Sequence, residues 1–170
     1  RSHYITQTVD GVAVAAGAVT HTDFTLASLP PEPVAVFSAV GGDTSNLLTW
    51  TNPSSAPLVG TMIRMRPDAY PVGPDDGVLL ADRAAQPGST DSFTHSGLMN
   101  GSQWFYSAFA YSGSAGRYYA AGVNASATPA GPGDFDRDGD VDQADFGILQ
   151  ACLTGSFQPQ NLIECQSARL

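Results

Sequence analysis

The feature that most restricts how this chain can fold is a run of carboxylates near its C-terminal end. Residues 134–145 read DFDRDGDVDQAD, with aspartates at positions 1, 3, 5, 7, 9 and 12 of the run and a glycine at position 6. Six like charges within twelve residues repel one another strongly unless a cation neutralises them. Calcium takes six to eight hard oxygen ligands, and this is the ligand spacing of a calcium loop. The run therefore predicts a loop wrapped around a calcium ion.

The spacing also assigns a role to each position of the loop. Side chains at alternate positions can point into one small loop, while Gly139 takes a turn that a side chain would forbid. The predicted side-chain ligands are Asp134, Asp136, Asp138 and Asp145. Asp140 would contribute its backbone carbonyl, and Asp142 would act directly or through a water molecule. The alternative is a solvated acidic turn without a metal.

The residues that flank the loop differ from those of a complete EF-hand. Position 12 is Asp145 where a glutamate is expected, and the Pro/Gly run at 128–133 cannot form an entering helix. Apolar residues at helical spacing predict an exit helix over 146–153, followed by Gly155. Residues 133–167 resemble one half of a type I dockerin, and more closely the dockerin-like calcium repeats of secreted planctomycete-type proteins. Dockerins carry two such loops, whereas this chain shows one.

The charge of the chain is concentrated in this loop. The formal net charge is −9, and the loop, with six aspartates and Arg137, carries five of these negative charges. The acidity thus reflects the predicted metal site, and nucleic acid is not an expected partner. The chain has no lysine, which excludes lysine–asparagine isopeptide crosslinks and Schiff-base chemistry. No apolar run reaches the length of a membrane span.

The two cysteines lie on the C-terminal side of the loop. Cys152 falls in the predicted exit helix and Cys165 follows thirteen residues later. A disulfide between them would stabilise the small module by roughly 3 kcal/mol on the loop-entropy estimate. The alternative is a pair of buried free thiols. A disulfide and a calcium site both favour an oxidising extracellular setting.

The middle of the chain predicts a β-sandwich. Short apolar or alternating runs punctuated by Gly, Pro, Asn and Asp predict seven strands, at 34–40, 46–51, 61–66, 78–81, 90–95, 103–111 and 117–127. The segments PPEPVAVFSA, LLTWTNP and SGLMNGSQWFYSAFAYS resemble a bacterial fibronectin type III domain. The resemblance implies a mainly β fold, an Ig-like sandwich, over residues 30–128. One departure is Trp104, which stands where that family usually has the tyrosine of its corner.

Alternation along 103–111 divides its residues between two faces of the sheet. Trp104, Tyr106, Ala108 and Ala110 would face the core and meet Trp50 and Leu48. The other face would then be unusually aromatic for a monomer surface. The candidate interface residues are Phe105, Phe109 and Tyr111, with Tyr118 and Tyr119 on the neighbouring strand. Either another molecule covers this face, or loops of the same chain do.

Residues 1–29 predict a further β segment that is incomplete on its own. Two or three short alternating strands are marginally stable in water, so something must complete them. VDGVAVAAGAVTHTDFTL resembles the closing strands of carboxypeptidase-regulatory-like sandwich repeats. The segment would pack on its own sandwich or insert into a neighbouring subunit by strand addition. Repeated head-to-tail insertion would generate a filament.

No catalytic constellation is evident in the sequence. His3, His21 and His95 are scattered, and neither a nucleophile elbow nor a His-Glu zinc motif occurs. The chain is therefore predicted not to be an enzyme. Two sequons make Asn100 and Asn124 candidate glycan acceptors, with chance occurrence as the alternative.

The predicted organisation is a β segment at 1–29, the sandwich at 30–128, a linker at 129–133 and a calcium-binding module at 134–170. One functional hypothesis is a secreted, calcium-stabilised structural or adhesion protein that joins copies of itself, or a neighbouring extracellular protein, into a filament or surface layer. The other is a spacer and dockerin-like anchoring tail of a larger secreted hydrolase. Fold alone does not choose between them.

Overall fold

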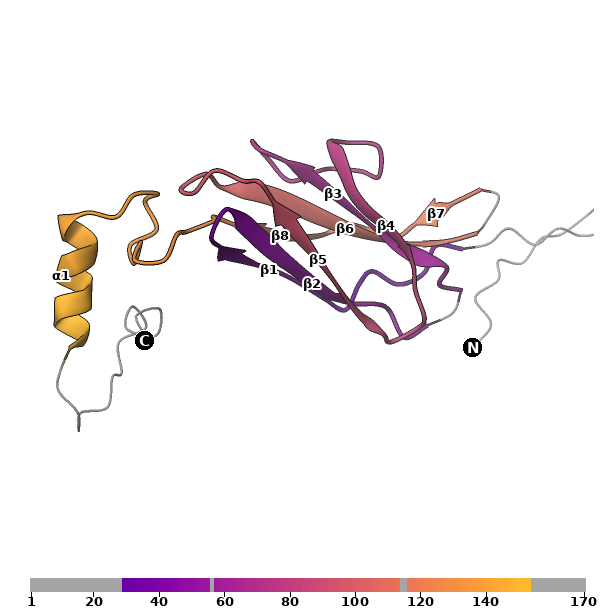
Figure 1. The fold of residues 1–170 in the computed structure, drawn as a ribbon. Helices are drawn as coiled ribbons and strands as arrows, with labels where there is room; N and C mark the ends of the chain where they lie inside the picture. The colour runs from indigo at the N-terminus through magenta and orange to yellow at the C-terminus, as the bar shows by residue number, and fades with distance from the viewer. Residues whose placement is uncertain (1–28, 56, 114–115, 154–170) are drawn as a thin grey trace, which may run out of the picture.

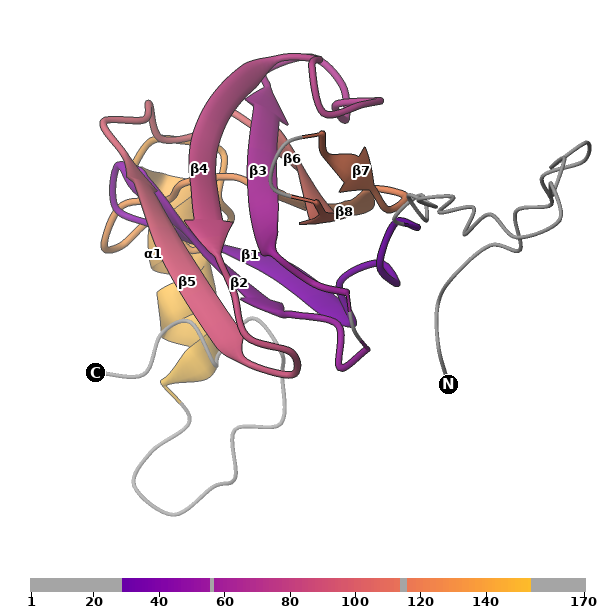
Figure 2. The same cartoon turned by 90° about the vertical axis from the view of Figure 1, so that its right-hand side faces the viewer.

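The computed structural model describes residues 29–55, 57–113 and 116–153 (Figure 1). This part of the chain forms a two-layered β-sandwich followed by one helix (Figures 1 and 2). The first layer has the strand order β1-β2-β5, comprising Val36–Gly42, Ser45–Thr51 and Thr90–Ser96. All its pairings are antiparallel. The mainly β sandwich predicted from the sequence is confirmed.

The second layer is built around β6 (Trp104–Ser112). On one side β6 pairs with β3 (Gly60–Arg66), which in turn pairs with β4 (Val78–Ala84). On its other side β6 pairs with β7 (Tyr118–Tyr119) and then with β8 (Val123–Ala127). A three-stranded antiparallel sheet thus packs on a larger antiparallel sheet, which is a sandwich architecture.

The core lies between the two sheets, as the alternation predicted. Leu48 and Trp50 of β2 and Tyr106 of β6 are each at most 1% exposed. They pack with Ile63 of β3 and with small alanines. Ala108 and Ala110 leave room opposite the large rings, so large and small residues alternate in the interior. Trp104 is only partly buried at the edge of this core.

The prediction of an aromatic outer surface on β6 is wrong for Phe109 and Tyr111. Phe109 is 3% exposed and Tyr111 is 4% exposed. A Cβ atom built on Gly122 would lie 2.6 Å from Cε1 of Phe109, so the backbone of the β7–β8 connection covers this ring. The Arg117 guanidinium lies 4.1 Å from the ring centroid of Tyr111. The same chain therefore covers this face, which was the alternative left open by the sequence.

Other parts of the chain cover the aromatic side chains near the two ends of β6. Tyr70, from the β3–β4 loop, packs edge-on against Phe105 with ring centroids 5.1 Å apart. The hydroxyl of Tyr111 donates to Asp82 Oδ1 at 2.8 Å, and burial together with this hydrogen bond raises the pKa of Tyr111 to about 12. Tyr119 is half-buried, with its ring centroid 5.6 Å from that of Tyr111. Of the five predicted interface residues, only Tyr118, at 43% exposure, presents a large exposed surface.

Two predicted elements differ in extent from those in the structure. The run 117–127 forms two strands, β7 and β8, interrupted at 120–122, where Gly122 lies over Phe109. The helix α1 spans Gln143–Cys152 and so begins three residues before the predicted start. Its N-cap is Asp142, which the sequence assigned only to metal binding. The predicted β segment at 1–29 lies outside the described residues except for Leu29.

A buried polar cluster links the two sheets near the start of β6. The Asn46 amide donates to the Tyr106 hydroxyl at 2.7 Å, and His95 Nδ1 lies 3.1 Å from the same hydroxyl. The His95 ring also meets Trp104 edge-on, with centroids 5.5 Å apart. Burial lowers the pKa of His95 below its ordinary value, so the folded state holds a neutral imidazole.

This burial predicts a pH-dependent stability that is attributable to His95. The unfolded chain binds a proton at His95 near pH 6.5, whereas the folded chain does so only at lower pH. Stability is therefore full above about pH 6.5 and falls as the pH drops from there towards the folded-state pKa. Urea unfolding at pH 7.5 and 5.5 should show this loss in the wild type and a smaller loss in His95→Gln. Equal losses in both proteins would contradict the assignment.

Candidate metal centre

The acidic loop is closed by hydrogen bonds from its own backbone. Asp142 caps helix α1 by accepting from the Ala144 amide at 2.7 Å. The Asp145 carboxylate returns to the Asp142 amide at 2.8 Å, which completes a capping box. The other oxygen of Asp145 accepts from the amides of Phe135, at 2.5 Å, and Asp136, at 3.3 Å. Asp145 therefore fastens the start of the loop to the start of the helix.

These bonds give Asp145 a role that the sequence did not predict, beside the metal binding that stays a prediction. Its side chain is buried, and both of its oxygens accept backbone hydrogen bonds. The bond from Asp142, followed by those from Phe135 and Asp136, lowers the pKa of Asp145 below its usual value. Asp145 is thus held ionised by the backbone and organises the loop.

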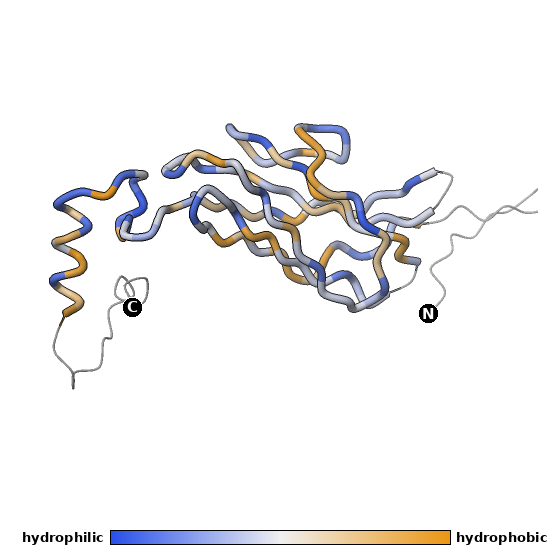
Figure 3. The backbone as a smooth tube through the Cα atoms, in the orientation of Figure 1, coloured by the Kyte–Doolittle hydropathy of each residue, from blue (hydrophilic) through white to orange (hydrophobic). Residues whose placement is uncertain are grey.

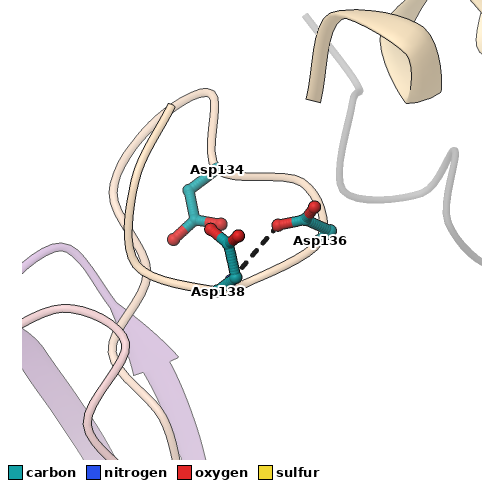
Figure 4. A group of neighbouring side chains, drawn as sticks. All are labelled: Asp134, Asp136 and Asp138. Atoms are coloured by element: carbon teal, nitrogen blue, oxygen red, sulfur yellow. Dashed lines mark hydrogen bonds between the residues drawn. The ribbon is translucent and has the colours of Figure 1, made fainter. Parts of the chain in front are cut away.

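Three other carboxylates converge at the opening of the loop (Figure 4). One oxygen from each of Asp134, Asp136 and Asp138 lies within 4.8 Å of the others. Calcium–oxygen bonds of about 2.3–2.6 Å place ligands on opposite sides of the ion at about 5 Å, so this spacing fits one shared cation. The Asp134 Oδ2 atom accepts from the Gly139 amide at 3.2 Å. Asp134 is 6% exposed, and its Oδ1 atom is buried without a hydrogen-bond partner.

The unpartnered Asp134 oxygen is the atom that best supports a metal. A buried carboxylate oxygen without a partner is costly, and a hard cation removes that cost. Asp136 and Asp138 supply two further oxygens of the kind calcium prefers. The donor set therefore fits calcium.

The second group of carboxylates lies at the end of the loop. Asp140, Asp142 and Asp145 also offer oxygens within 4.8 Å of one another. The charge of Asp138, together with desolvation and further carboxylates, raises the pKa of Asp140. The pKa of Asp136 is also raised: a bond from the Asp138 amide lowers it, but desolvation and neighbouring charges outweigh that effect. The structure therefore gathers the six predicted positions into two groups of three.

The surroundings of these carboxylates are mainly hydrophilic. Figure 3 shows the loop before α1 as mainly hydrophilic, next to a helix of mixed hydropathy. Gly139 adopts a φ of 107°, as the predicted turn requires. Arg137 adopts a φ of 62°, which is uncommon outside glycine.

The predicted disulfide and glycosylation sites lie outside the acidic loop. Cys152 is buried in α1, whereas Cys165 lies outside the described residues, so the disulfide stays a prediction. Asn124 is exposed, and its Oδ1 atom accepts from Ser107 at 2.8 Å. Asn100 uses both ends of its amide, accepting from the Thr44 amide at 2.9 Å and donating to Asp43 at 3.0 Å.

Sequence reasoning missed the surface on which the loop rests. The Asn100–Gly101 turn was interpreted only as a connection between strands, yet it touches the loop at Gly139. The Gly101 amide also donates to the Pro129 carbonyl at 2.9 Å, within the predicted linker. The only sign of this contact in the sequence is Gly101 itself, a glycine at a turn. Glycines are common at turns even where no other backbone segment approaches them.

Comparisons with known proteins bear on the sandwich alone. No family model and no curated protein matches the chain. Among solved structures, one described as FN3tt mut shares 18% identity over 58% of this chain and 96% of that one, with a TM-score of 0.41. An Fn3-like protein from Clostridium thermocellum shares 16% identity over 60% of this chain and 92% of that one, with a TM-score of 0.40. The FN1–FN3 domains of chicken CNTN1 share 14% identity over 62% of this chain and 36% of that one, also with a TM-score of 0.40.

These solved structures are fibronectin type III domains by their descriptions. The resemblances of the C-terminal module to dockerin repeats, and of residues 1–29 to carboxypeptidase-regulatory repeats, stay predictions. Within residues 29–55, 57–113 and 116–153, no helix combines the length and apolarity needed to cross a membrane.

Replacing Asp134 should weaken calcium binding strongly. Asp134→Ala removes the carboxylate that lies beside Asp136 and Asp138 and holds the buried unpartnered oxygen, and we expect calcium affinity to fall by at least about tenfold in isothermal titration calorimetry. Asp75→Ala makes the same charge change on an exposed β3–β4 loop and should bind like the wild type. Equal affinity in the two variants would contradict the site.

Replacing Asp145 should loosen the loop even when calcium is absent. Asp145→Ala removes the acceptor of three backbone amides, whereas Asp134→Ala leaves that acceptor in place. In chelator, hydrogen exchange of the Phe135 and Asp142 amides should therefore accelerate in Asp145→Ala and change far less in Asp134→Ala. Similar exchange rates in the two variants would show that Asp145 does not organise the loop.

Proposed function

We propose that this protein is a non-catalytic structural module of the extracellular space, braced by a calcium ion. In this proposal the sandwich acts as a spacer, and calcium stabilises the loop and helix that follow it. The observation that carries the proposal is the buried, unpartnered oxygen of Asp134 beside two further carboxylates. Extracellular calcium is abundant enough to occupy even the weaker sites of extracellular modules.

The path of the chain supports a spacer. The Leu29 carbonyl accepts from Ser112 Oγ at 2.6 Å, which places the entering chain beside the C-terminal end of β6. The departing chain at Pro129 meets Gly101, just before the N-terminal end of β6. The nine residues of β6 span about 27–30 Å, so the chain enters and leaves at opposite ends of the sandwich. Domains connected in this way extend in series.

The second part of the proposal is assembly with neighbouring molecules. Residues 1–29 would add strands to a neighbouring copy of this chain, or to a neighbouring extracellular protein, and so build a filament or surface layer. Phe109 and Tyr111 of β6 do not contribute to this contact, because both are buried within the chain. A Cys152–Cys165 disulfide would agree with a secreted setting.

Negative-stain microscopy of the full chain tests the assembly. With calcium present, we expect linear particles that are lost when residues 1–28 are deleted, because the deletion removes the donated strands. Single small particles from the full chain, with calcium and in chelator, would overturn the filament. They would leave the alternative of a spacer and anchoring tail on a larger secreted hydrolase.

A further inference from the structure

The calcium loop and the segment before it meet the sandwich at two of its turns. The β1–β2 turn contributes Gly42, whose carbonyl accepts from the Ala130 amide at 3.2 Å. The turn before β6 contributes Gly101, whose amide donates to the Pro129 carbonyl at 2.9 Å. Arg137 of the loop also lines a cavity of about 360 Å³ with Val40 of β1 and Thr128. The segment 129–139 is thus held to the sandwich on several sides.

Asn100 ties these two turns together. Its side chain accepts from the Thr44 amide at 2.9 Å and donates to the Asp43 carboxylate at 3.0 Å, so the β1–β2 turn is bound to the turn before β6. A Cβ atom built on Gly131 would lie 3.2 Å from the same amide nitrogen. That nitrogen is where an N-linked glycan would attach, and a glycan there would separate the two turns and the loop.

The closest approach of loop and sandwich is between two glycines. A Cβ atom built on Gly101 would lie 2.8 Å from the Asp138 carbonyl oxygen and 2.8 Å from Gly139 Cα. One built on Gly139 would lie 2.9 Å from Gly101 Cα. Gly139 is therefore required twice, for the turn of the calcium loop and for this backbone contact.

We infer that the Asn100–Gly101 turn is the site at which the calcium loop docks on the sandwich. This contact, called the latch below, lets calcium binding stabilise the sandwich as well as the C-terminal module. This inference rests on the calcium site proposed above. The latch contacts Asp138 and Gly139, which belong to the same loop as the metal-facing carboxylates. An ion that orders this loop favours the docked arrangement, and by reciprocity docking strengthens the binding of the ion. The module is then held in a set direction relative to the spacer.

Two glycine variants separate docking from backbone strain. Gly97 and Gly101 share a φ of 78°, so alanine is equally strained at both positions. No heavy atom lies within 4 Å of a Cβ built on Gly97, whereas one built on Gly101 collides with the calcium loop. Gly97→Ala is therefore the matched control for Gly101→Ala.

Unfolding of the sandwich can be followed separately from unfolding of the C-terminal module. The two tryptophans of the chain, Trp50 and Trp104, both lie in it, so tryptophan fluorescence follows its unfolding and not that of the module. In the full chain, calcium should raise the temperature of this transition in the wild type and by the same amount in Gly97→Ala. In Gly101→Ala the calcium-induced rise should disappear, and calorimetry should show calcium affinity about tenfold weaker than in Gly97→Ala.

The outcomes distinguish the latch from the metal site. Equal calcium affinity and equal calcium-induced shifts in Gly101→Ala and Gly97→Ala would overturn the latch while leaving the calcium site intact. A wild type that does not bind calcium in calorimetry would overturn both. If Gly101→Ala fails to fold, Asn100→Ala tests the latch without backbone strain, because it removes the side-chain bonds to Asp43 and Thr44 that hold this turn in place. It should weaken calcium binding in the same direction, and an unchanged affinity would contradict the latch.

Discussion

Burial of β6 on both faces is the constraint on which the rest of this structure depends. Its inner face packs on Trp50 and Leu48 of the opposite sheet. Its outer face is covered by Tyr70, by the backbone near Gly122 and by Arg117. The β3–β4 loop and the β7–β8 connection therefore fold back onto the sheet, because the rings of β6 would otherwise face water. The turn that leads into β6 lies against the acidic loop, at Asp138 and Gly139.

The carboxylates of the acidic loop have two different roles. Asp145, and Asp142 at the helix cap, satisfy backbone amides and so determine the shape of the loop without a metal. Asp134 keeps one buried oxygen unpartnered, and its carboxylate lies beside those of Asp136 and Asp138, which is an arrangement that a hard cation satisfies. A loop already shaped by its backbone, with one helix and a docked position, suits a static brace. A sensor loop would instead move a pair of helices.

Most strands were predictable because a strand with one buried face shows its period of two directly in the sequence. Trp104, Tyr106, Ala108 and Ala110 were assigned to the inner face in this way, and they line the core. The same alternation gave no information on what covers Phe109 and Tyr111, since a period identifies a face and not its partner. The helix start was misplaced because apolar spacing begins at Phe146, whereas the cap is a carboxylate that was already assigned to metal binding.

The sequence by itself determined the features that depend on neighbouring residues: the carboxylate spacing of 134–145, the turn at Gly139 and the faces of the strands. Each of these follows from chemistry within about a dozen residues of chain. Only the tertiary structure decided that the outer rings of β6 are buried within the chain and that Gly101 meets Gly139. These contacts join residues far apart in the chain, and whether a glycine serves a turn or a close approach depends on what packs against it.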